Sequence, residues 1–155
     1  MLRNKNLIPL SHQHQHALAF CVRIDKALAN PAAMDTSVIQ QEITALYEAE
    51  LARHFEAEEK ILFPAAEQVE DLASLVDELR VEHGLIRRGV KRAGAKDLTV
   101  SDIQVFAASL SAHIRKEERQ LFEAIQQQVS AEELDRVGAE IELILTSDRR
   151  RSSGT

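Results

Sequence analysis

One pattern of histidines and glutamates occurs twice in the sequence. The motif His-x-x-x-Glu-Glu-x-x-Leu-Phe begins at His54 and again at His113. Residues four apart lie one turn apart on the same face of a helix. That face also carries the apolar residues, so each His and the Glu that follows it, Glu58 or Glu117, points into the core. A buried carboxylate without a partner is costly, and a bound cation removes the cost. The repeat therefore predicts a metal site.

Two further histidines lie on apolar helix faces. His83 is on the stripe that contains Ile86, and His14 is in register with Leu18, whereas His16 is rotated away from that line. Each of four helices thus offers one inward His, and two helices add a Glu. Four imidazoles and two carboxylates form a nitrogen and oxygen donor set that suits iron, manganese or zinc.

Other polar residues near the motif have less specific interpretations. Glu59 and Glu118 follow the inward glutamates and lie about 100° further round the helix, so we expect them at the rim or in solvent. Tyr47, one heptad before His54, either donates to the site or packs in the core. A single His on an apolar face is more often a core residue than a ligand. The metal interpretation therefore depends on all six residues together.

The apolar spacing is helical along nearly the whole chain. Ser11 is a plausible N-cap, Pro64 is expected to kink or break the second helix, and Thr99 with Asp102 forms a capping-box pattern. The predicted helices, four amphipathic ones and a short fifth, lie at about residues 11–30, 35–69, 71–94, 99–125 and 130–145. Amphipathic helices joined by short loops favour an all-α fold, an antiparallel up-down four-helix bundle with a short extra C-terminal helix.

Length and composition set further bounds. The 155 residues, of which 45% are hydrophobic and 28% charged, suit a single domain, which we expect over residues 1–147, followed by a polar, disordered tail over residues 148–155. The net charge of −6 offers no basic face for nucleic acid. There is no apolar run long enough to span a membrane and no secretory signal. Cys21 is the only cysteine, which fits a reducing compartment. We therefore expect a cytoplasmic protein without nucleic-acid or membrane partners.

With these motifs the chain resembles the hemerythrin-like (HHE cation-binding) family over about residues 8–128. The matching motifs lie at residues 10–18, 53–64, 81–83 and 113–122. The resemblance implies a four-helix bundle that holds a non-haem di-iron centre, with two irons per chain. It implies four terminal ligands and two bridging carboxylates, with His16 as the alternative or additional ligand from the first helix. The implied terminal ligands are His14, His54, His83 and His113, and the implied bridges are Glu58 and Glu117.

The sequence departs from the oxygen-carrying hemerythrins on two helices. Those proteins have His-x-x-x-His on the third helix and His-x-x-x-x-Asp on the fourth. Here Leu79 and Arg87 stand four residues before and after His83, and the acid Glu117 follows His113 by four. Fewer protein ligands mean more open coordination positions. Sensing of O₂, NO or peroxide, iron binding, and redox chemistry are therefore expected at least as much as oxygen carriage.

The leading hypothesis is a non-haem di-iron protein that binds or senses O₂, NO, peroxide or iron, with zinc or manganese as alternative metals. Its expected partners are that small ligand and a redox or signalling protein whose identity the sequence does not give. One alternative is a di-iron oxidase or peroxidase on the same site, although the Glu-x-x-His signature of ferritin-like enzymes is absent. Another is a non-catalytic module for histidine phosphotransfer, for which His113, near Arg115 and Lys116, is the candidate.

Overall fold

The structure, a computed structural model, describes residues 2–152, with side chains through residue 147. Within these residues the chain is all-helical and contains no strand, as the sequence predicts. Five long helical stretches follow one another, and two of them are built from several elements. The first two are α1 (Ile8–Leu28) and residues 36–67, made of α2 (Thr36–Leu46), η2 (Tyr47–Leu51), α3 (Ala52–Ala57), η3 (Glu58–Leu62) and α4 (Phe63–Glu67). The others are α5 (Ala73–Gly94), residues 100–128, made of α6 (Val100–Lys116), η5 (Glu117–Leu121) and α7 (Phe122–Gln128), and α8 (Ala131–Ser152). The short 3-10 helices η1 (Pro31–Ala33) and η4 (Glu70–Leu72) lie before the second and the third stretch.

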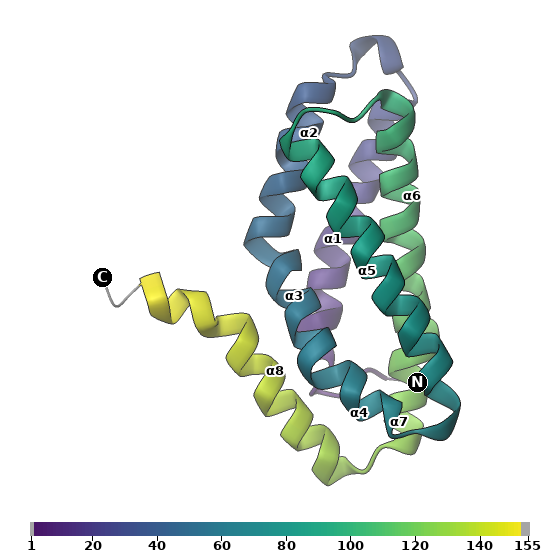
Figure 1. Cartoon of the computed structure of the whole chain (residues 1–155), viewed down its shortest axis with the longest axis vertical. Helices are drawn as coiled ribbons and strands as arrows, with labels where there is room; N and C mark the ends of the chain where they lie inside the picture. Colours follow the sequence, from purple (N-terminus) through teal and green to yellow (C-terminus); the bar gives the residue numbers. More distant parts are fainter. Residues whose placement is uncertain (1, 153–155) are drawn as a thin grey trace.

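Four of the stretches lie lengthwise beside one another (Figure 1). α1 packs against α6, α2 packs against α5, and α5 packs against α6. α8 packs against α3 and η3 and then leads away from the other helices toward the C-terminus. This arrangement is consistent with a helical bundle. No helix in the described part of the chain combines the length and the hydropathy that a membrane crossing requires.

The helix ends follow local capping signals. Thr99 Oγ1 accepts a hydrogen bond from the backbone N–H of Asp102 (3.1 Å), and Asp102 Oδ2 accepts one from the N–H of Thr99 (3.0 Å), which confirms the capping box. The prediction for Ser11 was wrong, because α1 begins at Ile8 with Pro9 in its first turn. Proline is favoured there since the first N–H groups of a helix have no helical acceptor. The Ser11 side chain instead donates to Glu118.

The fifth helix is longer than the sequence predicts. α8 has 22 residues and continues past Leu145 to Ser152. Between Gly138 and Gly154 the sequence contains neither Gly nor Pro, so no residue there ends the helix. Residues 153–155, which belong to the predicted tail, lie outside the described residues.

Each inward glutamate of the repeated motif begins a π-turn. The N–H of Phe63 donates to the carbonyl of Glu58, five residues earlier, and the N–H of Phe122 donates to the carbonyl of Glu117. Pro64 does not end the helix, because it lies in the first turn of α4, immediately after the π-turn. The same turn occurs in residues 100–128 without a proline. These two π-turns therefore accompany the motif and do not depend on Pro64, although a third, η2, precedes the first copy of the motif. Such turns are frequent at functional sites.

The apolar core is divided into two clusters by a polar layer. On α5, His83 lies between Leu79 of one cluster and Ile86 of the other, and on α1, His14 lies between Leu10 and Ala17 in the same way. One cluster includes Phe20, Phe55, Ile86, Phe106 and Leu110, and the other includes Leu10, Phe63, Leu79, Phe122 and Ile141. The helices thus hold the polar layer at mid-height, with hydrocarbon above and below it.

Candidate metal centre

The polar layer consists of six buried imidazoles and carboxylates. Their exposed fractions lie between 0 and 2%. They come from α1, residues 36–67, α5 and residues 100–128, and they are His14, His54, Glu58, His83, His113 and Glu117. The structure therefore brings together all six residues that the helical spacing places on inward faces.

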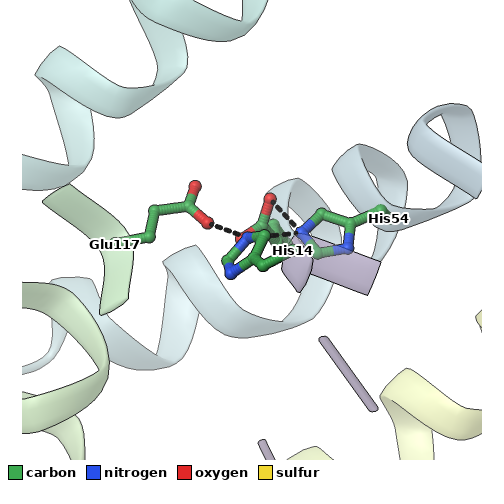
Figure 2. A group of neighbouring side chains, drawn as sticks. His14, His54 and Glu117 are labelled. Atoms are coloured by element: carbon green, nitrogen blue, oxygen red, sulfur yellow. Dashed lines mark hydrogen bonds and ion pairs between the residues drawn. The ribbon is translucent and has the colours of Figure 1, made fainter. Parts of the chain in front are cut away.

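One group of donors lies on the α1 side of the layer. His14 Nε2 is 3.0 Å from Glu117 Oε2 and 3.0 Å from His54 Nε2. His54 Nε2 is 3.3 Å from Glu58 Oε1. Figure 2 shows how His14, His54 and Glu117 point toward one another. These four side chains are close enough together to ligate a single ion.

A second group of donors lies on the α5 side and uses the same two carboxylates. His113 Nε2 is 2.8 Å from Glu117 Oε1, and His83 Nε2 is 3.3 Å from Glu58 Oε1. His83, His113, Glu58 and Glu117 can also ligate one ion. The two oxygens of Glu117 thus face opposite groups, and both carboxylates are common to the two groups.

The inner atoms of this layer lack the hydrogen bonds that buried polar atoms normally make. Both carboxylate oxygens of Glu58 and of Glu117 have no hydrogen-bond partner, and neither has Nε2 of His83 or of His113. Buried polar atoms are nearly always paired, so each exception requires an explanation. A cation would satisfy these converging lone pairs. The imidazole nitrogens and carboxylate oxygens therefore fit iron, manganese or zinc.

Each imidazole is also fixed by a hydrogen bond on the side that faces away from Glu58 and Glu117. Its outer nitrogen, Nδ1, donates to a side chain on a neighbouring helix, which fixes the ring orientation and turns the lone pair of Nε2 inward. The pairs are His14 with Glu118 (2.7 Å), His54 with Gln13 (2.8 Å), His83 with Glu59 (2.7 Å) and His113 with Glu82 (2.8 Å). The four bonds form a closed ring, because each of the four helices donates one bond and accepts one.

Three of the four acceptors are carboxylates, and each carboxylate contacts a cation. Burial raises the pKa of Glu59, but the bonds from His83 and Arg87 outweigh burial and lower that pKa to about 2. The ion pairs are Arg87 with Glu59 (2.7 Å), Arg3 with Glu118 (3.3 Å), and Lys116 with Glu82. These three acceptors therefore carry a negative charge, and each of them is hydrogen-bonded directly to the Nδ1–H of an imidazole.

Mutual contact shifts the pKa values within the layer in opposite directions. Burial, and then the charge of Glu117, raises the pKa of Glu58 well above its usual value. Burial also opposes ionisation of Glu117, but the charge of His113 outweighs it and lowers the Glu117 pKa well below normal. Burial would lower the pKa of His14 and of His113, but Glu117, together with Glu118 at His14 and Glu82 at His113, overcomes this and raises both to about 9. Protons thus compensate the carboxylate charge when no metal is bound.

Two other sequence candidates lie away from the layer. His16 is 64% exposed, and its Nδ1 is 2.8 Å from Glu50 Oε1, so the α1 residue in the layer is His14. The hydroxyl of Tyr47 accepts a hydrogen bond from Arg87 Nε (3.3 Å) and thereby supports the residue that holds Glu59. His113 is only 2% exposed, which leaves little access for the phosphoryl donor that the phosphotransfer hypothesis requires.

The sequence interpretation missed the residues behind the imidazoles. Glu59 and Glu118 were predicted at the rim or in solvent, but they are partly buried and accept bonds from His83 and His14. Gln13 and Glu82 were not singled out. A signal was present, because each missed residue is adjacent in sequence to an inward ligand candidate: Gln13 and Glu82 precede a His, and Glu59 and Glu118 follow a Glu.

The comparisons with known proteins agree with this geometry. The family model described as the hemerythrin HHE cation binding domain matches residues 9–125. No curated protein and no solved structure gave a match. The matched range includes all six residues of the polar layer and more than half of the chain. The chain therefore belongs to the hemerythrin HHE cation-binding domain family.

Proposed function

We propose that this protein binds two iron ions in the polar layer of an antiparallel, up-down four-helix bundle formed by residues 8–128. One observation carries the proposal. Two pairs of imidazole nitrogens face the same two buried carboxylates, and the inner atoms of those carboxylates have no hydrogen-bond partner. Such an arrangement is unfavourable in a core unless cations occupy it.

The structure supports a specific division of ligands. His14 and His54 would hold one ion, and His83 and His113 would hold the other. Glu58 and Glu117 would bind both ions, since each carboxylate approaches both pairs of imidazoles. When bound, the two irons would supply one-electron redox chemistry and open coordination positions for a small ligand.

Aromatic rings pack directly against two of the imidazoles. Phe55 stacks on His83 with the ring centroids 3.8 Å apart, and Phe122 stacks on His14 at 5.5 Å. A surface cavity of about 280 Å³ is lined by Glu82 of α5 and by Ser109, Ala112 and His113 of α6. We propose that the bound ligand is a small molecule such as O₂, NO or peroxide, and that the protein acts in binding or sensing.

Iron loading tests this proposal. Elemental analysis after anaerobic addition of Fe²⁺ is expected to give about two irons per chain, matching the two donor groups. Exposure to air should then produce near-ultraviolet and visible charge-transfer absorption of iron(III). Protein that takes up no iron, or that remains colourless after loading and oxidation, would contradict the assignment.

Metal affinity should rise with pH, because a metal ligand must lose its proton. The pKa values of His14 and His113 are raised to about 9, so protons compete with a metal for these two rings below that pH. Each proton that the metal displaces should change the affinity by about tenfold per pH unit below that pKa. Competition with a chelator at pH 6 and pH 8, together with measured proton release, checks this expectation. Equal affinity at the two pH values would show that the imidazoles do not compete for protons.

A further inference from the structure

The polar layer is built from two similar halves. α1 with residues 36–67 corresponds to α5 with residues 100–128, because each pair contributes one His from its first helix and a His-x-x-x-Glu-Glu motif from its second. The supporting hydrogen bonds follow the same correspondence. The bond from His14 to Glu118 has its equivalent in the bond from His83 to Glu59.

The remaining pair of bonds breaks this correspondence. His113 donates to Glu82, which carries a negative charge, whereas His54 donates to the amide oxygen of Gln13, which does not. Both donor–acceptor distances are 2.8 Å, so the difference lies in the charge of the acceptor and not in the geometry. Gln13 is thus the one neutral acceptor among the four.

The charge of the acceptor affects how strongly an imidazole binds a metal. A carboxylate that accepts from Nδ1–H makes the opposite nitrogen more basic, and hydrogen bonds to charged acceptors are stronger than those between neutral groups. Both imidazoles on the α5 side have carboxylate acceptors, Glu59 and Glu82. On the α1 side only His14 has one.

Gln13 also lies beside a surface opening. It lines a cavity of about 520 Å³ together with Lys5 and His12 near α1 and Glu142 on α8. The His54 corner of the layer is therefore near solvent, with one partly exposed amide between the imidazole and the cavity. His113 on the α5 side also lines a surface cavity, of about 280 Å³, so the two sides differ in the charge of the acceptor and not in their closeness to a cavity.

We propose that Gln13 makes the two metal positions unequal, so that the ion between His14 and His54 is bound more weakly and exchanges first. This inference rests on the proposed function, because it requires two bound ions. Gln13 acts as a positioning residue through His54 and does not itself touch metal. The protein would then hold one ion firmly at His83 and His113 and release the other as conditions change.

The test is stepwise removal of Fe²⁺ by a chelator under anaerobic conditions, with the iron that remains measured at each step. The natural chain should lose its two ions in two separate phases. Gln13→Glu should move the first phase to chelator concentrations about tenfold higher, and bring the two phases together, as expected for a change behind a ligand. Lys5, whose Nζ is 3.7 Å from Asp135 Oδ1, lines the same cavity.

Two further variants make the test specific. Glu82→Gln creates the amide acceptor on the other side and should move the second phase to lower chelator concentrations, again bringing the phases together. Lys116 keeps its contact with Glu78 in this variant. Gln15→Glu adds the same charge on the exposed side of α1 and should change neither phase.

The outcomes separate this inference from the proposed function. Two irons that leave the natural chain in a single phase, or phases that Gln13→Glu and Glu82→Gln leave in place, would overturn the inference while the two-iron assignment stands. A shift caused equally by Gln15→Glu would also overturn it, because general charge would then explain the effect. A chain that binds no iron at all would contradict the proposed function as well.

Discussion

Replacing Glu117 by Gln is expected to remove both metal ions from the protein. The two oxygens of this carboxylate face different donor groups, with Oε2 3.0 Å from His14 Nε2 and Oε1 2.8 Å from His113 Nε2. The amide has nearly the same shape but lacks the negative charge, and it would turn an N–H donor toward one of the imidazoles. Iron per chain, measured on the purified protein, should fall from about two to near zero, because both ions lose a charged oxygen ligand at once.

A matched control for Glu117→Gln is Glu56→Gln. Glu56 is on the surface of α3, paired with Lys60, and lies outside the polar layer. The Glu56→Gln substitution removes the same charge, and the variant protein should retain the full iron content. Glu58→Gln should behave like Glu117→Gln, because Glu58 Oε1 is equally distant, at 3.3 Å, from His54 and His83 Nε2. Normal iron content in either inward variant would show that these carboxylates are not ligands.

Removing the metal should lower the thermal midpoint of the protein by about 10 °C or more. A ligand present at 1,000 times its dissociation constant stabilises the folded state by about 4 kcal/mol, and for a chain of this size each kcal/mol shifts the midpoint by about 2–4 °C. The physical cause is the pair of buried carboxylates, Glu58 and Glu117, which only protonated neighbours compensate when no cation is present.

Thermal denaturation followed by circular dichroism, before and after chelation, measures this loss. Adding Fe²⁺ back should restore the higher midpoint. The Glu117→Gln variant provides the control, because a protein that holds no iron has nothing for the chelator to remove, and its midpoint should not move. An unchanged midpoint in the natural chain after complete metal removal would indicate that the folded state does not depend on the metal.

The composition of the polar layer was predictable because it depends on the geometry of single helices. A spacing of four places His54 with Glu58, and His113 with Glu117, on one face, and apolar neighbours identify that face as the inner one. The same reasoning placed His14 in register with Leu18 and rotated His16 away from that line, with His16 kept as the alternative ligand. In the structure His14 is buried and His16 is exposed.

The residues behind the imidazoles could not be identified in the same way. Glu59 and Glu118 lie well round the helix from the inward glutamates, and on an isolated helix that position faces solvent. Their burial depends on which neighbouring helix supplies a histidine at the same height, and that information comes from packing. The longer α8 has a local explanation, because the polar sequence after Leu145 has no apolar stripe to follow but also nothing that ends a helix.

The correspondence between the two halves of the bundle has a consequence for how such a centre can be assembled. Each helical hairpin carries two imidazoles, one inward carboxylate and two of the outer acceptors. The two imidazoles of a hairpin face its own carboxylate and also the carboxylate of the other hairpin. Neither hairpin is complete by itself, yet one hairpin joined to a rotated copy of itself would supply every donor. In such a symmetric dimer every substitution changes both halves, whereas in a single chain a substitution changes one half alone. The two halves of one chain can differ at single positions, as they do at Gln13 and Glu82.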